Sequence, residues 1–287
     1  MEPNQIKYYA QTLSSGFKWL ELYILSDVHY GNPFCNVKDW LWTLDYLAKT
    51  PNAYVILNGD LCESALKTSK GDIYRQVGTP QDQRDWQIKQ LLPLKGKVLG
   101  MTAGNHEDRI YNDAGMDISR DIATALGCPY DPDAIAVKIS FGNGNDHNNG
   151  RPFVYYVYCS HGWGGARTRG AKSAKVERQG HYVFADIHAM SHDHEVNVSP
   201  DTYLNPDPRT SPEKDEDGNE TGFTIGRYTA HRTELVKTNA FVMWGGYSRK
   251  YGFSPSDLVT PTIWLAGEEK PWPMAKKNNK PEVRVVA

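Results

Sequence analysis

The stretch KVLGMTAGNHED, residues 97–108, decides how this chain is interpreted. Its first part is a short run of aliphatic and small residues, which is typical of a buried strand, and the glycine at its end indicates a tight turn. Asn105 and His106 would then project from the end of a strand, at the mouth of a sheet. Open α/β folds place their chemistry at that edge.

Four other apolar runs end in the same way. Each is followed within a few residues by side chains that can bind a metal ion: Asp27 and His29 after residues 22–26, Asp60 after 53–57, His161 after 153–159, and His192 and His194 after 182–190. Because one arrangement recurs along the chain, we expect these side chains to form a shared site.

Local signals predict the elements between these runs. Asn36 can cap a helix that ends before Pro51, so that strand, helix and strand form a parallel βαβ unit. Thr79 can cap a second helix that ends near Leu92. We also expect a helix over residues 115–126, a strand over 134–141 and an exposed loop over 142–150 that includes His147. Antiparallel strands are expected near 222–230 and 236–248. Residues 1–19 are expected to form a lead-in that pairs at a sheet edge.

The chain has 287 residues, which one α/β domain with insertions can fill. We expect a single domain over residues 1–266, with a polar insertion or long hairpin at about 200–221, and a C-terminal tail over 267–287. The formal charge of −2 gives no general attraction to polyanions, so a nucleic-acid partner would need a local basic patch.

Cysteine usage and hydropathy bear on the compartment. The four cysteines are dispersed, which favours a reducing, cytoplasmic setting, and Cys159 reads as a core residue. The first residues show no signal pattern, and no apolar run approaches the length of a membrane span. We therefore expect a cytoplasmic protein without a membrane partner.

The ordered blocks Asp-x-His, Gly-Asp, Gly-Asn-His-Glu, His-Gly and His-x-His resemble the calcineurin-like metallophosphoesterase superfamily, in the stand-alone form carried by phages and bacteria. The resemblance covers about residues 20–195, and five ordered blocks are far more specific than one motif. It implies a four-layer α/β/β/α sandwich of two mixed sheets with metal ligands at one edge. Ser191 stands where the family commonly has glycine, so we expect a modest backbone adjustment there.

The resemblance also implies a dinuclear metal centre. The first metal would be bound by Asp27, His29 and His194, the second by Asn105, His161 and His192, and Asp60 would bridge both. Aspartate, asparagine and histidine together suit Mn, Fe, Zn or Ni, with Mn favoured, and argue against Ca.

The activity implied is hydrolysis of phosphate esters, and of phosphodiesters in particular, by a hydroxide that bridges the metals. His106 would be the general acid, and Glu63 stands where related phosphatases carry an acid that orients this histidine, so we hypothesise a His106–Glu63 dyad. Arg109, Arg167 and Arg169 are candidates for binding the substrate phosphate, although each is also explained as a solvated or structural charge.

Several alternatives stay open. The basic run from Arg167 to Arg178, beside Trp163, could follow a nucleic-acid backbone, but a solvated helix face explains it better. A non-catalytic scaffold that binds partner proteins is the rival function, although such relatives lose ligands that are intact here. A structural metal site would not account for His106. We expect His181, His188 and His231 to pack in the core or on the surface, and the oligomeric state stays open.

Overall fold

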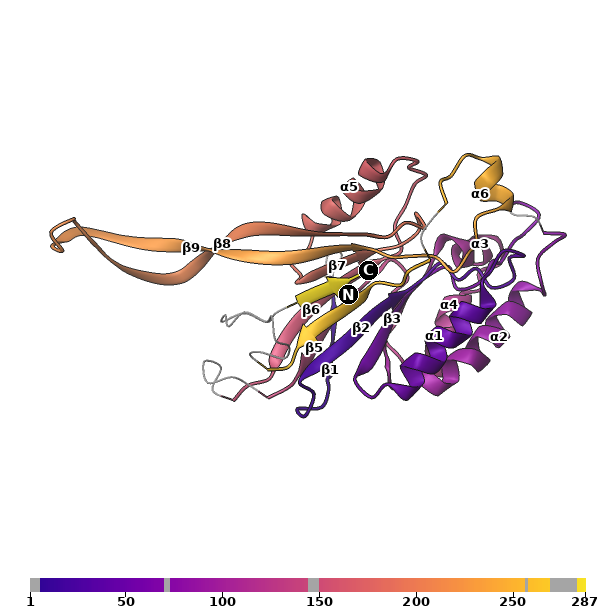
Figure 1. Ribbon diagram of the computed structural model, residues 1–287, viewed down its shortest axis with the longest axis horizontal. Coiled ribbons are helices and arrows are strands. Elements are labelled where there is room, and N and C mark those ends of the chain that lie inside the picture. The colour runs from indigo at the N-terminus through magenta and orange to yellow at the C-terminus, as the bar shows by residue number, and fades with distance from the viewer. Residues whose placement is uncertain (1–5, 70–72, 144–149, 256–257, 269–282) are drawn as a thin grey trace.

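The computed structural model describes residues 6–69, 73–143, 150–255, 258–268 and 283–287. Two mixed sheets form the centre of the molecule (Figure 1). The first has the order β11-β10-β2-β3-β4, with bounds Val283–Val286, Thr262–Ala266, Trp19–Leu25, Ala53–Asn58 and Val98–Thr102. The second has the order β1-β5-β6-β7-β9-β8, with bounds Tyr8–Thr12, Ala134–Phe141, Phe153–Ser160, Ile187–Met190, Glu220–Lys237 and Asn197–Lys214.

Helices cover the outer faces of both sheets. Against the first sheet lie α1 (Val37–Lys49), α2 (Pro80–Leu91), α3 (Asn105–Ala114) and α4 (Ile118–Leu126), with a short 3₁₀ turn, η1, at Leu92–Leu94. Against the second sheet lies α5 (Arg169–Gly180), and α6 (Gly246–Lys250) follows β9. The expected α/β/β/α sandwich of two mixed sheets is confirmed.

Strand β2 shows how the two cores arise. Successive side chains of a strand point to opposite faces. Leu22 and Ile24 therefore enter the core between the sheets, whereas Tyr23 and Leu25 enter the core under the helices. All four side chains are at least nine-tenths buried. Two apolar layers thus fix the edge at which the strands of both sheets end.

The two predicted helix caps, Asn36 and Thr79, are present in the structure. The Asn36 side chain accepts a hydrogen bond from Asp39 N at the start of α1, and Thr79 and Asp82 form a capping box on α2. The helix expected from residue 115 begins later, because Gly115 ends α3 with φ 68° and Asp117 caps α4. Helix α3 itself, which begins at Asn105, was not predicted.

Residues 236–248 do not form the expected strand. Strand β9 ends at Lys237, and the residues that follow bond through their backbone to residues at or after the ends of other strands. Thr238 N donates to Met190 O, and Phe241 N donates to Asp27 O. This segment thus bonds to the end of β7 and to the loop after β2, and its strand-like pairing is limited to an isolated bridge between Val242 and Cys35.

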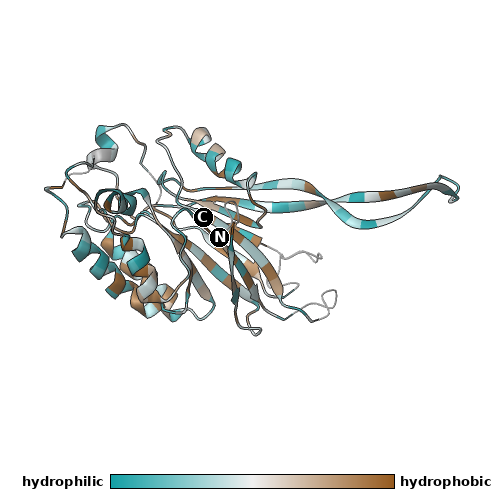
Figure 2. Cartoon of the chain, turned by 180° about the vertical axis from the view of Figure 1, so that it is seen from behind, coloured by the Kyte–Doolittle hydropathy of each residue, from teal (hydrophilic) through white to brown (hydrophobic). Residues whose placement is uncertain are grey.

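The polar insertion is a long hairpin. Strands β8 and β9 have 18 residues each, so the ribbon extends for about 60 Å at the usual rise per residue. Its outer part stands away from the body, and its residues are largely polar with a few apolar ones between them (Figures 1 and 2). Only the last residues of β9, Glu234–Lys237, pair with β7.

Both chain ends of the described part lie at sheet edges. Strand β1 pairs with β5 at the edge of the second sheet, as expected for the lead-in, and β5 pairs antiparallel with β6. Strand β11, within the expected tail, pairs with β10. Residues 269–282 of that tail, and His147 with residues 144–149 of the expected loop, lie outside the described residues. Across the described ranges, no helix has the length and apolar character that crossing a membrane requires.

We predict that the outer hairpin is dispensable for folding. Leu204 pairs with Ala230, and the residues beyond this pair are mostly exposed, so a two-residue Asn-Gly turn can replace residues 205–229. The thermal midpoint should stay within roughly 3 °C of the full chain, because little apolar area is removed from the core. Thr233→Lys, at the buried end of β9, is the contrasting variant and should lower it clearly. A large fall on shortening the hairpin would contradict the prediction.

We also predict a pH-dependent contribution from His188. This side chain is fully buried on β7, and within the described part of the chain neither ring nitrogen has a hydrogen-bond partner. Burial lowers its pKa from 6.5 to about 4, and His231 acts in the same direction. Between these values the unfolded chain binds a proton that the folded chain does not, so stability falls as the pH drops.

The measurement compares His188→Leu with the exposed-site control His181→Leu. Urea unfolding at pH 7 and pH 5 should show the original protein and the control losing more stability than His188→Leu. The pKa shift corresponds to at most about 3 kcal/mol. Equal pH dependence in all three proteins would contradict the prediction.

Candidate metal centre

The residues that follow five strands meet at one edge of the sandwich. Three groups each place one ligand atom per residue within 4.8 Å of the others: Asp27, His29 and His194; Asp60, His161 and His192; and His29, Asp60 and His106. Every member is buried or half-buried. The structure therefore brings together every residue that the sequence marked as a metal ligand, with Asn105 beside the second group.

In the first group, two histidines and a carboxylate face one another. His194 Nε2 lies 3.1 Å from Asp27 Oδ1, and His29 Nε2 lies 3.1 Å from His194 Nε2. His29 Nε2 is also 3.7 Å from Asp27 Oδ1 and 3.7 Å from Asp60 Oδ2. Asp60 therefore faces this group as well as its own.

The second group has the same character. His161 Nε2 lies 3.1 Å from Asp60 Oδ2 and 3.2 Å from Asn105 Oδ1. His192 Nδ1 lies 2.8 Å from the same Asn105 oxygen. Asn105 is the first residue of α3, so the end of β4 and the beginning of that helix deliver its amide oxygen to this position.

The outward nitrogens of these histidines indicate their tautomers. His161 Nδ1 lies 2.8 Å from Asn58 O, and His192 Nε2 contacts Gly164 O. A carbonyl oxygen only accepts, so each of these nitrogens carries the hydrogen. The opposite nitrogens then present lone pairs toward the site, as metal-ligating histidines do.

With these imidazoles neutral, acceptors converge at the site without donors between them. Lone pairs of His161 and His192 meet the oxygens of Asp60 and Asn105, and Asp27 Oδ1 is buried without a hydrogen-bond partner among the described residues. Buried acceptors that face one another repel unless a cation lies between them. The mixed nitrogen and oxygen set fits a transition-metal ion, and these buried groups could hold metal ions.

The charges of the site act in the same sense. Burial opposes ionisation of Asp27 and Asp60, but the neighbouring His194 and His161 outweigh it and hold both pKa values well below the usual range. Burial also disfavours the charged form of His161, yet the negative charge of Asp60 raises its pKa to about 9. Asp27 and Asp60 thus stay ionised and hold positive charge beside them, either as a proton on a neighbouring histidine such as His161 or as a bound metal ion.

The backbone is strained where these side chains are presented. Among the described residues other than glycine, six have positive φ, and five of them belong to the metal groups: Asp27, His29, Asp60, His192 and His194, with φ between 48° and 70°. Left-handed backbone is costly for such residues and gathers at functional sites. A fold that retains it in five ligand residues points to function at this edge.

Two glycines and a glutamate hold the central loops together. A Cβ on Gly59 would lie 2.5 Å from Gly104 N, and one on Gly104 would overlap Asp60. Glu107 joins the two loops, because its carboxylate accepts hydrogen bonds from Asp60 N, Cys62 N and Gly104 N. The glutamate of the GNHE block thus fixes the loop that carries Asp60, a role that the sequence analysis did not identify.

Ser191 has a specific role in this chain. Its hydroxyl contacts Thr238 Oγ1 at 2.9 Å and accepts from Asn58 Nδ2, and Thr238 Oγ1 lies 2.9 Å from Ser26 Oγ. Ser26 donates to Asp27 Oδ2 at 2.8 Å. Ser191 therefore joins a buried hydroxyl network that ends on a candidate ligand.

The residues between and after the last two histidines face helix α5. Asp193 accepts from Lys175 Nζ and Lys237 Nζ, both at 2.7 Å. Glu195 accepts from Lys172 Nζ at 2.6 Å and pairs with Arg169 at 2.9 Å. Lys172, Lys175 and Lys237 are all more than nine-tenths buried. Lys172 and Lys175 of the basic stretch therefore help to position the His-x-His segment, whereas its arginines, Arg167, Arg169 and Arg178, are exposed.

His106 and Glu63 lie together, but not in the expected way. His106 Nδ1 is 2.8 Å from the backbone oxygen of Glu63, whereas the Glu63 carboxylate is 3.7 Å away. That carboxylate lies 3.4 Å from His29 Nδ1 and accepts from Asn32 Nδ2. The main chain of Glu63 thus orients His106, while its side chain faces a candidate ligand.

The three arginines differ in their surroundings. Arg109 lies one turn after Asn105 on α3, and its Nη1 atom is buried without a hydrogen-bond partner in the described ranges. Arg167 is exposed, with its guanidinium 5.8 Å from the centre of the Phe253 ring. Arg169 is directed to Glu195. Of the three, Arg109 alone combines proximity to His106 with unused donor capacity.

We predict that Asp60 is required for metal binding. An excess of Mn²⁺ at 100 times the dissociation constant should stabilise the protein by about 2.7 kcal/mol, since the ion binds only the folded state. Asp60→Asn should abolish most of this gain, and the exposed control Asp45→Asn should keep it. Urea unfolding with and without Mn²⁺, with bound metal counted by mass spectrometry, provides the test. Equal stabilisation of both variants would show that Asp60 is not a ligand.

The comparisons with known proteins do not assign the chain to a family. No family model matches the sequence, and no curated protein matches it. Among the solved structures, one that is similar is the crystal structure of a conserved uncharacterized protein from Streptococcus pneumoniae TIGR4, described as a predicted phosphoesterase. The identity is 11% over 94% of this chain and 100% of that chain, with a TM-score of 0.34. The function proposed below is therefore based on the geometry of the site and not on this similarity.

Proposed function

We propose that this chain is a metal-dependent phosphoesterase that hydrolyses phosphodiesters at a centre of two divalent ions. The single observation that carries the proposal is that Asp60 Oδ2 faces both groups, 3.7 Å from His29 Nε2 and 3.1 Å from His161 Nε2, with His106 Nε2 at 3.9 Å from the same oxygen. Asp27, His29 and His194 would hold one ion, Asn105, His161 and His192 the other, and Asp60 both. When bound, such ions neutralise phosphate charge, activate water and stabilise the departing oxygen.

His106 has the geometry of a proton donor to the leaving group. Its Nδ1 hydrogen is held by Glu63 O, so Nε2 faces the site. Burial lowers its pKa to about 4, while Asp60 and Glu63 act in the opposite direction. A phosphate bound beside the imidazole adds negative charge, which raises the pKa of His106 from this low value and favours the protonated form that catalysis needs.

The charge balance favours diesters over monoesters. Lys172, Lys175, Lys237 and Arg169 are paired with Asp193 or Glu195, and among the described arginines near the site Arg109 has a buried donor without a partner. A diester carries one negative charge and a monoester up to two. A site with one available arginine beside its metals is therefore better matched to a diester.

The same ion pairs weaken the case for nucleic acid along α5. Two of its lysines are buried and neutralised, so the helix presents less positive charge than its sequence indicates. The non-catalytic scaffold is also less favoured, because a surface used only for docking would not require strained ligand residues or a positioned His106.

We predict that the fall in turnover on losing His106 depends on the leaving group. His106→Ala should lower turnover of an alkyl phosphodiester by about 10²–10⁴ fold, the usual contribution of general acid catalysis. Turnover of a p-nitrophenyl diester should fall far less, because p-nitrophenolate leaves without a proton. His181→Ala, at an exposed site, is the control and should retain both activities.

The assay uses Mn-loaded protein and both esters. An equal loss with both leaving groups would assign His106 a role other than general acid. No turnover of any phosphodiester with Mn, Fe, Zn or Ni would overturn the proposed function.

A further inference from the structure

The two edges of the long hairpin differ in their ability to pair with another strand. Strand β8 is the last strand of its sheet, and it contains four prolines: Pro200, Pro206, Pro208 and Pro212. Proline has no N–H donor, and prolines on an edge strand hinder pairing with another chain. Strand β9 contains no proline. Of the two edges, only that of β9 is therefore suited to accept a further strand.

The outer edge of β9 is occupied only near the body of the molecule. Glu234–Lys237 pair with β7, and Thr233 Oγ1 donates to Ala185 O. Residues Thr224–Thr229 pair with β8 on one side, and in the described ranges no strand pairs with them on the other. All of these residues are exposed, and a two-stranded ribbon is only marginally stable by itself. We call Thr224–Thr229 the free edge.

The base of the hairpin carries an aromatic and basic patch. Tyr182 N donates to Gln179 O at the end of α5, and the ring of Phe184 lies 4.3 Å from the ring of His231 on β9. Tyr182 and Phe184 are nevertheless 65% and 53% exposed. Arg178, in the last turn of α5, is exposed as well. We call Arg178, Tyr182 and Phe184 the base patch.

The tip of the hairpin has the opposite charge. Against Lys214, residues 213–220 contain five acidic side chains: Glu213, Asp215, Glu216, Asp217 and Glu220. This charge disfavours nucleic acid or an anionic membrane as the partner of the ribbon, because both would be repelled. When two such ribbons pair antiparallel, the tip of each points toward the base of the other. The acidic tip would then approach the base patch of a second copy.

We propose that the free edge of β9 pairs antiparallel with the same edge of a second copy of this chain, so that two hairpins form a four-stranded ribbon. A two-fold axis uses the same surface on both copies, so no further sequence is needed. An axis at Gly226 places Thr224 opposite the partner's Tyr228, and Ile225 opposite the partner's Arg227. Aromatic and β-branched residues are favourable cross-strand pairs, and no like charges face each other in this register.

The interface is small, so the association should be weak. We expect a dissociation constant on the order of 10 µM, as for the smaller protein interfaces. At such concentrations the dimer adds little to the thermal midpoint, which agrees with a hairpin that folding does not need. The association does not depend on the proposed catalytic function.

Sedimentation velocity over a range from about 1 µM to about 200 µM protein tests the proposal. The unmodified chain should change from monomer to dimer, and the dimer should weaken in about 0.5 M salt, which screens the charges of tip and base patch. Replacing residues 205–229 by Asn-Gly should leave a monomer at every concentration.

A double variant tests the free edge itself. Thr224→Lys with Tyr228→Lys places lysines opposite each other across the two-fold axis and should weaken association at least about tenfold. The matched control is Leu204→Lys with Thr210→Lys, which adds the same charge to exposed positions on β8 and should associate normally. A thermal scan confirms that both variants fold.

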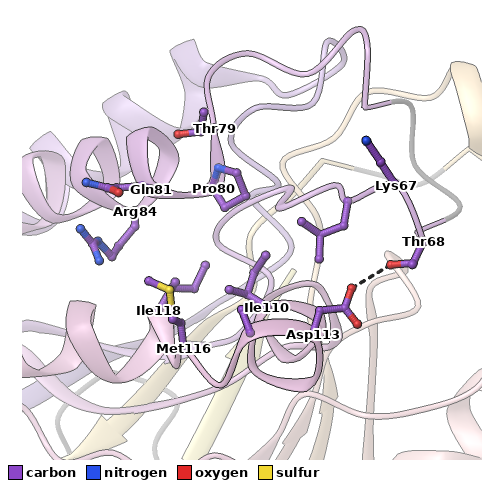
Figure 3. A pocket seen from close by; sticks show the side chains of 12 residues that line it. Lys67, Thr68, Thr79, Pro80, Gln81, Arg84, Ile110, Asp113, Met116 and Ile118 are labelled. Atoms are coloured by element: carbon purple, nitrogen blue, oxygen red, sulfur yellow. Dashed lines mark hydrogen bonds between the residues drawn. The ribbon is translucent and has the colours of Figure 1, made fainter.

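A second pair of variants tests the base patch. Arg178→Glu should weaken the dimer and remove most of its dependence on salt. Its control is Lys67→Glu, because Lys67 is exposed and lines a cavity between the loop after β3 and helices α2 and α3, on the side away from the hairpin (Figures 1 and 3). The control should associate as the unmodified chain does.

Three results would overturn the proposal. They are a monomer at the highest concentration, a dimer that persists after residues 205–229 are replaced, and equal association of the two lysine double variants. If Arg178→Glu and Lys67→Glu associate equally, the approach of the acidic tip to the base patch is wrong.

Discussion

The position of Asp60 is the constraint on which the rest of the site depends. Its backbone nitrogen donates to Glu107, its backbone oxygen accepts from His29 N, and its Oδ1 accepts from His106 N. Its Oδ2 then faces the histidines of both metal groups. Each polar atom of one buried residue is thus committed, and the two halves of the centre share its carboxylate. The close approach of Gly59 and Gly104 makes this arrangement possible.

This arrangement is costly when no cation is present. Carboxylates, an amide oxygen and imidazole lone pairs lie together in a buried edge, and five ligand residues hold left-handed backbone. Strain of this kind costs on the order of 1–3 kcal/mol per residue and persists only where surrounding structure imposes it. The two apolar cores and the bonds of Glu107 supply that constraint, and a bound ion would offset the repulsion among the acceptors.

The sequence predicts which side chains gather at this edge, because each follows a strand that its own pattern reveals. Asp27, Asp60 and His161 come directly after apolar runs, so local periodicity is enough to place them at the sheet edge. The helix caps at Asn36 and Thr79 are predictable for the same reason. The hydroxyl network at Ser191 is not, because its members lie on segments far apart in the chain. The hydrogen bond from His106 to the main-chain oxygen of Glu63 could not be predicted either, because every residue has such an oxygen and the sequence distinguishes only side chains.

The segment from His192 to Glu195 shows what a motif leaves out. The motif specifies the two histidines, but Asp193 and Glu195 bind the buried lysines of α5. A buried lysine without its acid, or a buried acid without its lysine, would be strongly destabilising, so the two partners depend on each other. The acids beside the candidate ligands therefore explain Arg169, Lys172 and Lys175 of the basic stretch, but not the exposed Arg167 and Arg178. The sequence of a basic run does not reveal its partners, which here are acids that alternate with the candidate ligand histidines.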